Sequence, residues 1–157
     1  MKAATIHEIK QELGTHSQKE LVELCLRLGR FKKENKELLT YLLYEAHDEQ
    51  GYIGSVKNEI DEQFTGINLS HLYFVKKSLR KILRMINKHV RYTGSKQAET
   101  EWLIYLCQKI NKSGIPFEKS PMLLNLYNGQ IKKLKTVIGT LHEDLQYDYI
   151  KELEQLK

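Results

Sequence analysis

Apolar residues recur along this chain at the three- and four-residue spacing of an amphipathic helix. No stretch alternates with period two over the length of a strand. Glycines and helix-capping residues divide the helical pattern into segments. The pattern therefore predicts helices at about 6–13, 17–28, 31–46, 52–64, 70–92, 95–110, 120–138 and 140–156.

Several helix starts have a recognisable capping signal. Ser17 followed by Glu20, and Thr140 followed by Glu143, have the spacing of a capping box. Ser120 precedes a proline at the first helical position, where the missing N–H is not needed. About eight helices joined by short loops pack antiparallel to their neighbours, so we expect an all-α fold. It is either an irregular bundle or a short stack of helical hairpins of the armadillo or HEAT kind.

The phases of these helices predict which side chains form the core. The predicted core comprises Leu39, Leu42, Leu79, Ile82, Ile86, Leu103 and Leu106. In the second helix the residues expected to pack inward are Leu21, Val22, Leu24, Cys25 and Leu28. Cys25 and Cys107 are the only cysteines, too few for a disulfide framework or a zinc site. Each lies on an apolar stripe, so we expect reduced, buried thiols.

A chain of 157 residues is expected to form one domain, residues 1–157. The segments 37–43 and 101–107 share a pattern, Glu-x-Leu-x-Tyr-Leu-x, which suggests an internal duplication of about 17–64 and 70–138. Chance similarity between two amphipathic helices explains the pattern equally well.

The segment from Ser70 to Tyr92 carries seven cations and no carboxylate. On a helix with about 100° per residue, six of them share one arc about 100° wide, opposite an apolar stripe, and Tyr73 lies on the same side. The seven are Lys76, which falls outside the arc, and the six members Lys77, Arg80, Lys81, Arg84, Lys88 and Arg91. We call these six residues the basic arc.

The positive charge of the chain is concentrated in the segment that contains the basic arc. The formal net charge is +5 and the Ser70–Tyr92 segment carries +7, so the rest of the chain carries −2. Such a helix face suits an anionic partner, which is RNA, DNA or an acidic protein. The alternative is a solvated face that is partly paired with the acidic C-terminal segment, which holds Glu143, Asp144, Asp148, Glu152 and Glu154.

An enzyme alternative comes from Arg84 followed five positions later by His89. This spacing resembles the Arg-x4-6-His element of the HEPN nucleases, helical proteins that cut RNA at a dimer interface with an Arg and a His and without a metal. That resemblance implies a homodimer with Arg84 and His89 as catalytic residues. Met85 stands where that family usually has a polar residue.

Other signatures of catalysis or cofactor binding are missing from the sequence. Glu45, His47, Asp48 and Glu49 lack the spacing of a known metal motif, and no Gly-rich phosphate loop occurs. We therefore expect no metal and no cofactor. Without a signal-peptide core or an 18-residue apolar run, a cytoplasmic protein without membrane contact is expected.

In the segments 33–39 and 76–84 the chain resembles small helical bacterial proteins of unknown function, a resemblance that implies no activity. The sequence thus predicts a non-catalytic binding or adaptor protein that uses the basic arc. A purely structural helical subunit is the remaining alternative.

Overall fold

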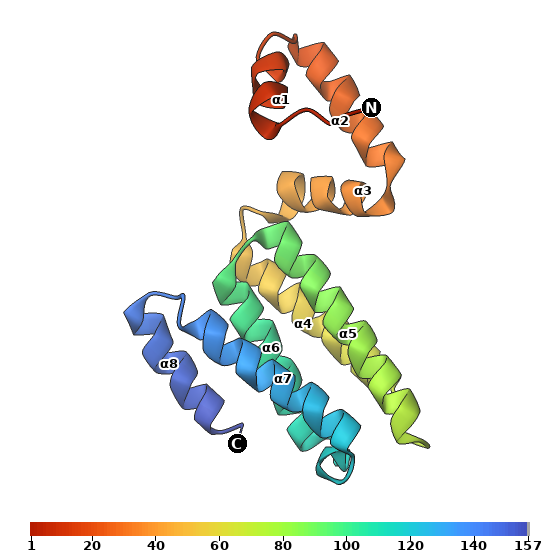
Figure 1. Ribbon diagram of the computed structural model, residues 1–157, viewed down its shortest axis with the longest axis vertical. Helices are drawn as coiled ribbons and strands as arrows, with labels where there is room; N and C mark the ends of the chain where they lie inside the picture. Colours follow the sequence, from red (N-terminus) through yellow and green to blue (C-terminus); the bar gives the residue numbers. More distant parts are fainter. Residues whose placement is uncertain (157) are drawn as a thin grey trace. The chain divides into compact units, whose positions relative to one another are not determined.

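The computed structural model describes residues 1–156 and is all-helical, as the sequence predicts (Figure 1). Lys157, the last residue of the acidic segment, lies outside the described residues. By its internal contacts the chain, expected as one domain, divides into two compact units. Unit 1 is Met1–Tyr44 and unit 2 is Glu45–Lys157. This boundary lies inside residues 17–64, the first half of the suggested internal duplication.

Unit 1 contains α1 (Ile6–Leu13), α2 (Gln18–Phe31) and α3 (Lys33–Thr40). A π-helical turn, Tyr41–Glu45, follows α3 and contains the boundary between the units. The capping box predicted at Ser17 is confirmed, because Glu20 N donates to Ser17 Oγ and Ser17 N donates to the Glu20 carboxylate. The helix predicted at 17–28, with Gly29 as its stop, instead continues through Gly29 to Phe31. A Cβ at position 29 would lie 3.1 Å from Leu39 Cδ1, so this glycine permits the close approach of α3.

The apolar stripes of unit 1 are largely exposed, contrary to the prediction. Apart from Tyr41, no described side chain of residues 1–44 is buried. Val22, Leu24 and Leu28 are exposed, Leu21 and Leu39 are half-buried, and Leu42 is 55% exposed. An amphipathic helix pattern does not say whether another element covers its apolar face.

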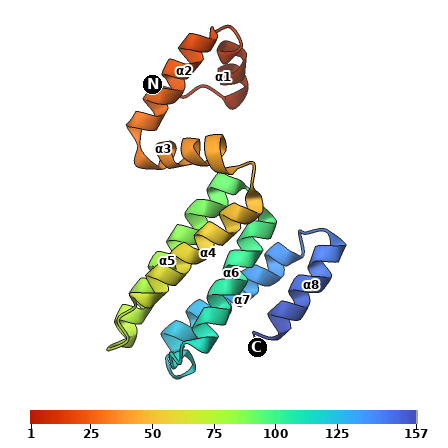
Figure 2. The same cartoon turned by 180° about the vertical axis from the view of Figure 1, so that it is seen from behind.

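Unit 2 is a bundle of five helices in which consecutive helices run antiparallel (Figures 1 and 2). They are α4 (Glu49–Thr65), α5 (Leu72–Thr93), α6 (Lys96–Lys112), α7 (Pro121–Ile138) and α8 (Glu143–Glu154). A 3₁₀ turn, Phe117–Lys119, precedes α7. The predicted cap at Ser120 is confirmed. The capping box predicted at Thr140 is wrong: the Thr140 hydroxyl donates to the Val137 carbonyl, and His142 caps α8 instead.

The core of unit 2 surrounds α6, which packs against α4, α5, α7 and α8. Five of the seven predicted core residues are buried, and all five belong to this unit: Leu79, Ile82, Ile86, Leu103 and Leu106. Trp102 is also fully buried and its indole N–H donates to the Ile53 carbonyl at 3.1 Å, which joins α6 to α4. Because α6 is surrounded, it fixes the positions of the other four helices.

The two cysteines differ in environment. Cys107 lies in the α6 core, and burial raises the pKa of its thiol to about 12. Cys25 lies on α2 and is exposed, so the prediction of two buried thiols is wrong for this residue. The cause is again the open apolar face of unit 1.

None of the helices among the described residues combines the length and the apolar character needed to cross a membrane.

Replacing Leu106 with Ala should lower the free energy of unfolding of unit 2 by about 2–5 kcal/mol, because the side chain is fully buried at the centre of the bundle. Urea titration followed by fluorescence of Trp102, the single tryptophan, reports this unit. Leu69→Ala is the matched control, since Leu69 is 62% exposed, and should change stability by less than about 0.5 kcal/mol. Equal midpoints for the two variants would contradict the central position of α6.

Candidate cationic groove

The basic arc lies on the outer face of α5, opposite the stripe that packs into unit 2. Val75, Leu79, Ile82 and Ile86 are buried on one side of the helix. Lys77, Arg80, Lys81, Arg84 and Arg91 are exposed, and Lys88 is half-buried with its ammonium 6.0 Å from the Tyr92 ring centroid. The helix ends at Gly94, whose φ of 64° is the left-handed conformation that favours glycine. One long amphipathic helix therefore presents almost all of these cations to solvent.

Part of this face forms a groove of about 630 Å³. Seven lining residues come from α5 and one from α7: Tyr73, Lys76, Lys77, Arg80, Leu83, Arg84, Asn87 and Met122. These eight described residues include four cations and no carboxylate. An anion entering the groove therefore meets positive charge without a competing acidic side chain.

The groove includes a cation that the sequence analysis placed outside the basic arc. Lys76 lies about 40° beyond Arg80 on a helical wheel, on the side toward α7. Lys81 and Lys88 lie on the other edge of the arc and are not among the groove residues. Helical periodicity predicts the charged face of α5. The position of α7 beside α5 determines which part of that face is concave.

The side of the groove next to α7 is fixed by Lys133. Its ammonium donates to Asn87 Oδ1 at 3.0 Å and pairs with Glu99 Oε1 at 2.7 Å, so one side chain links α5, α6 and α7. The other oxygen of Glu99 pairs with Lys96 at 3.0 Å. The importance of Glu99 and Lys133 could not be predicted from the sequence. The two residues lie on different helices, and nothing within either helix indicates that they pair.

Glu99 is a buried carboxylate held by two cations. Burial by itself raises the pKa of this carboxyl, but hydrogen bonds from Lys133 and Lys96 outweigh burial, and the net pKa is lowered. The group is therefore ionised at neutral pH. Its ion pair with Lys133 stabilises the contact between α6 and α7. Lys133 in turn holds Asn87, which lines the groove.

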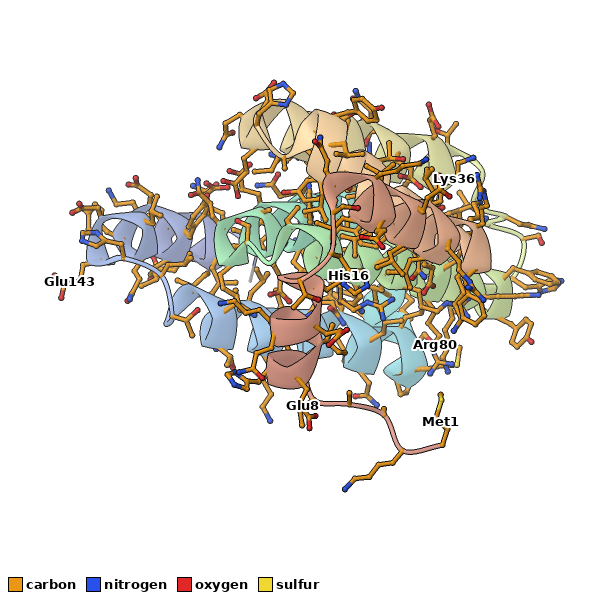
Figure 3. The ribbon with its side chains drawn as sticks, turned by 90° about the horizontal axis from the view of Figure 1, so that it is seen from above. Met1, Glu8, His16, Lys36, Arg80 and Glu143 are labelled. Atoms are coloured by element: carbon orange, nitrogen blue, oxygen red, sulfur yellow. The ribbon has the colours of Figure 1, made fainter. Side chains whose placement is uncertain are left out.

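The acidic C-terminal helix does not pair with the exposed cations of the basic arc. α8 packs against α6 and α7. Within residues 1–156, no salt bridge joins Lys77, Arg80, Lys81, Arg84 or Arg91 to a carboxylate. Figure 3 labels Arg80 and Glu143, which lie at opposite sides of unit 2.

Arg84 and His89, the pair in the ribonuclease alternative, are not brought together within one chain. Five helical positions separate them by about 140° around α5. His89 faces α4, where Nδ1 contacts the Tyr52 hydroxyl at 2.7 Å and Nε2 contacts Glu59 Oε2 at 3.2 Å. Its ring also lies 6.2 Å from the Trp102 ring. His89 thus belongs to a junction of three helices, whereas Arg84 lines the groove.

The other candidate sites are less specific. In the described part of the chain, no three His, Cys, Asp or Glu side chains gather in a way that could hold a metal ion, and the segment 45–49 is no exception. Unit 1 has a groove of about 790 Å³, but it is lined by Glu20 and Glu23 together with Lys19, Arg27 and Arg30. Mixed charge of this kind gives no clear preference for an anion or a cation.

Replacing Glu99 with Gln should destabilise unit 2 at pH 7 by about 1–3 kcal/mol, because two charge-assisted hydrogen bonds are weakened. The pKa of Glu99 is lower in the folded chain than its usual 4.5, so the unfolded chain binds its proton first as the pH falls. The contribution of Glu99 is therefore complete above about pH 5 and is lost as the pH falls through the folded-state pKa. Urea midpoints at pH 7 and pH 4 measure it.

The difference between the parent protein and Glu99→Gln should be smaller at pH 4 than at pH 7. Glu118→Gln, at an exposed glutamate, is the control and should change neither midpoint. A deficit of Glu99→Gln that does not vary with pH would mean that the carboxylate charge does not hold the junction.

Comparison of the chain with family models, with curated proteins and with solved structures finds no match. The chemistry of the groove itself must therefore carry any argument about function.

Proposed function

We propose that this protein is a non-catalytic binding or adaptor protein that contacts nucleic acid through the groove cations of α5. The observation that carries the proposal is the set of four cations, Lys76, Lys77, Arg80 and Arg84, lining one groove without a carboxylate. A nucleic acid backbone is a linear array of phosphates, and a row of cations matches it.

The spacing along α5 supports this match. At 1.5 Å per residue, the run from Lys77 to Arg84 covers about 10 Å along the helix axis. Consecutive phosphates of one strand lie within such a length, and the four groove cations can neutralise at most about four of them. Arginine also forms paired hydrogen bonds to phosphate oxygens, which favours Arg80 and Arg84 as the strongest contacts.

The remaining members of the basic arc extend the positive field beyond the groove. Lys81 and Arg91 are exposed on the same helix, and their charge attracts a polyanion before close contact forms. Contacts made to phosphates carry no sequence information. We therefore expect weak binding with little sequence preference.

Binding to a fluorescently labelled oligonucleotide, measured by anisotropy, should depend steeply on salt. With about four phosphates engaged, the logarithm of affinity falls with the logarithm of salt at a slope near −3 to −4, or about a hundredfold between 50 and 200 mM. Arg80→Gln and Arg84→Gln should each reduce the slope by about one. The charge reversal K77E/R80E/R84E should abolish binding at low salt while leaving the helical circular dichroism unchanged.

The matched control is K112E/K119E/K135E, which makes the same change in net charge at three exposed lysines outside the groove. It should retain most of the affinity. Equal loss in the two triple variants would show that net charge and not the groove governs binding, and no binding at low salt would refute the proposal. Cleavage of an RNA probe in the presence of EDTA would favour the ribonuclease alternative instead.

A further inference from the structure

An exposed aromatic residue stands at one end of the cation row. Tyr73 lines the groove and is 66% exposed. It precedes Lys77 by four positions and Arg84 by eleven, so it lies on the same helix face, about 6 Å along the axis from Lys77. An aromatic side chain exposed to this extent has no role in the core of unit 2.

The Tyr73 ring contacts an aromatic neighbour without being covered by it. It makes a T-shaped contact with Phe74 at 5.6 Å between ring centroids. Phe74 in turn lies 6.0 Å from the His71 ring. This contact leaves most of the Tyr73 side chain open to solvent.

A cationic groove that ends in an open aromatic ring is the combination used to bind single-stranded nucleic acid. The phosphates follow the cations while an unpaired base stacks on the ring. A base inside a duplex is already stacked on both faces and cannot do this. The phosphate contacts serve both kinds of strand, so Tyr73 is the groove residue that can distinguish them.

We propose that the groove binds single-stranded nucleic acid in preference to duplex, with one base stacked on Tyr73 and the adjoining phosphates on Lys77, Arg80 and Arg84. This inference rests on the proposed function. It specifies single-stranded nucleic acid as the partner, a preference over duplex that the cations alone would not produce.

The test compares a labelled oligothymidine strand with a duplex of the same length, at one salt concentration, against the full-length protein. The parent protein should bind the single strand more tightly. Tyr73→Ala should weaken single-strand binding about five- to hundredfold, the range found for loss of one stacked base. Duplex affinity and the salt slope should not change, because the residue is uncharged. Tyr73→Phe should restore the preference, since the stacking ring is kept.

Tyr147→Ala is the control, because Tyr147 is exposed to a similar extent, 63%, but lies on α8 outside the groove. It should bind both probes as the parent protein does. The inference is overturned if Tyr73→Ala binds the single strand as tightly as the parent, or if it loses the same factor for both probes. In either case the proposed function survives provided that K77E/R80E/R84E still abolishes binding. If that triple variant binds normally, the proposed function itself has failed.

Discussion

The burial of α6 among four other helices is the interaction on which the structure of unit 2 depends. Nine of its residues are buried, including Trp102, Leu103 and Leu106. Polar contacts at the edges of this core fix the relative positions of the helices. Glu101 pairs with Lys57 of α4 at 2.7 Å and accepts a hydrogen bond from Tyr149 of α8 at 3.2 Å. The apolar core supplies most of the stabilisation, because partly exposed ion pairs contribute little.

The packing of α5 into this core compensates for the repulsion among its cations. Like charges three or four positions apart on a helix destabilise it by a few tenths of a kcal/mol per pair, and α5 has several such pairs. Burial of Val75, Leu79, Ile82 and Ile86 offsets that cost, since each buried aliphatic side chain contributes about 1.5–3 kcal/mol. The core thus holds the cations in a fixed row. The proposed contact with an anionic partner rests on this fixed row of cations.

The sequence could predict what depends on local periodicity. Helical phase placed Leu79, Ile82 and Leu106 in the core, and it placed Arg80 and Arg84 on the opposite face of α5. Local signals were less dependable where a distant element decides the outcome. Gly29 carries the usual sign of a helix stop, yet α2 continues through it and Leu39 of α3 packs closely there.

The remaining features depend on pairs of elements far apart in sequence. Cys25 is exposed although its helix is amphipathic, because no other element of unit 1 covers that stripe well enough to bury it. Lys76 joins the groove, and Lys133 fixes the α7 side, only because α7 lies beside α5. No pattern within a single helix contains this information. The charge of the site was therefore predictable, whereas its concave shape and its supports were not.

The central claim is that an anionic partner binds in the groove between α5 and α7. Mapping the changes in backbone amide chemical shift while oligothymidine is added tests it most directly, because the method reports each residue separately. The account predicts that the largest changes fall on residues 73–87 of α5 and around Met122, with little change on the exposed face of α8. Changes concentrated in unit 1 or on α8, with α5 unaffected at saturation, would contradict it.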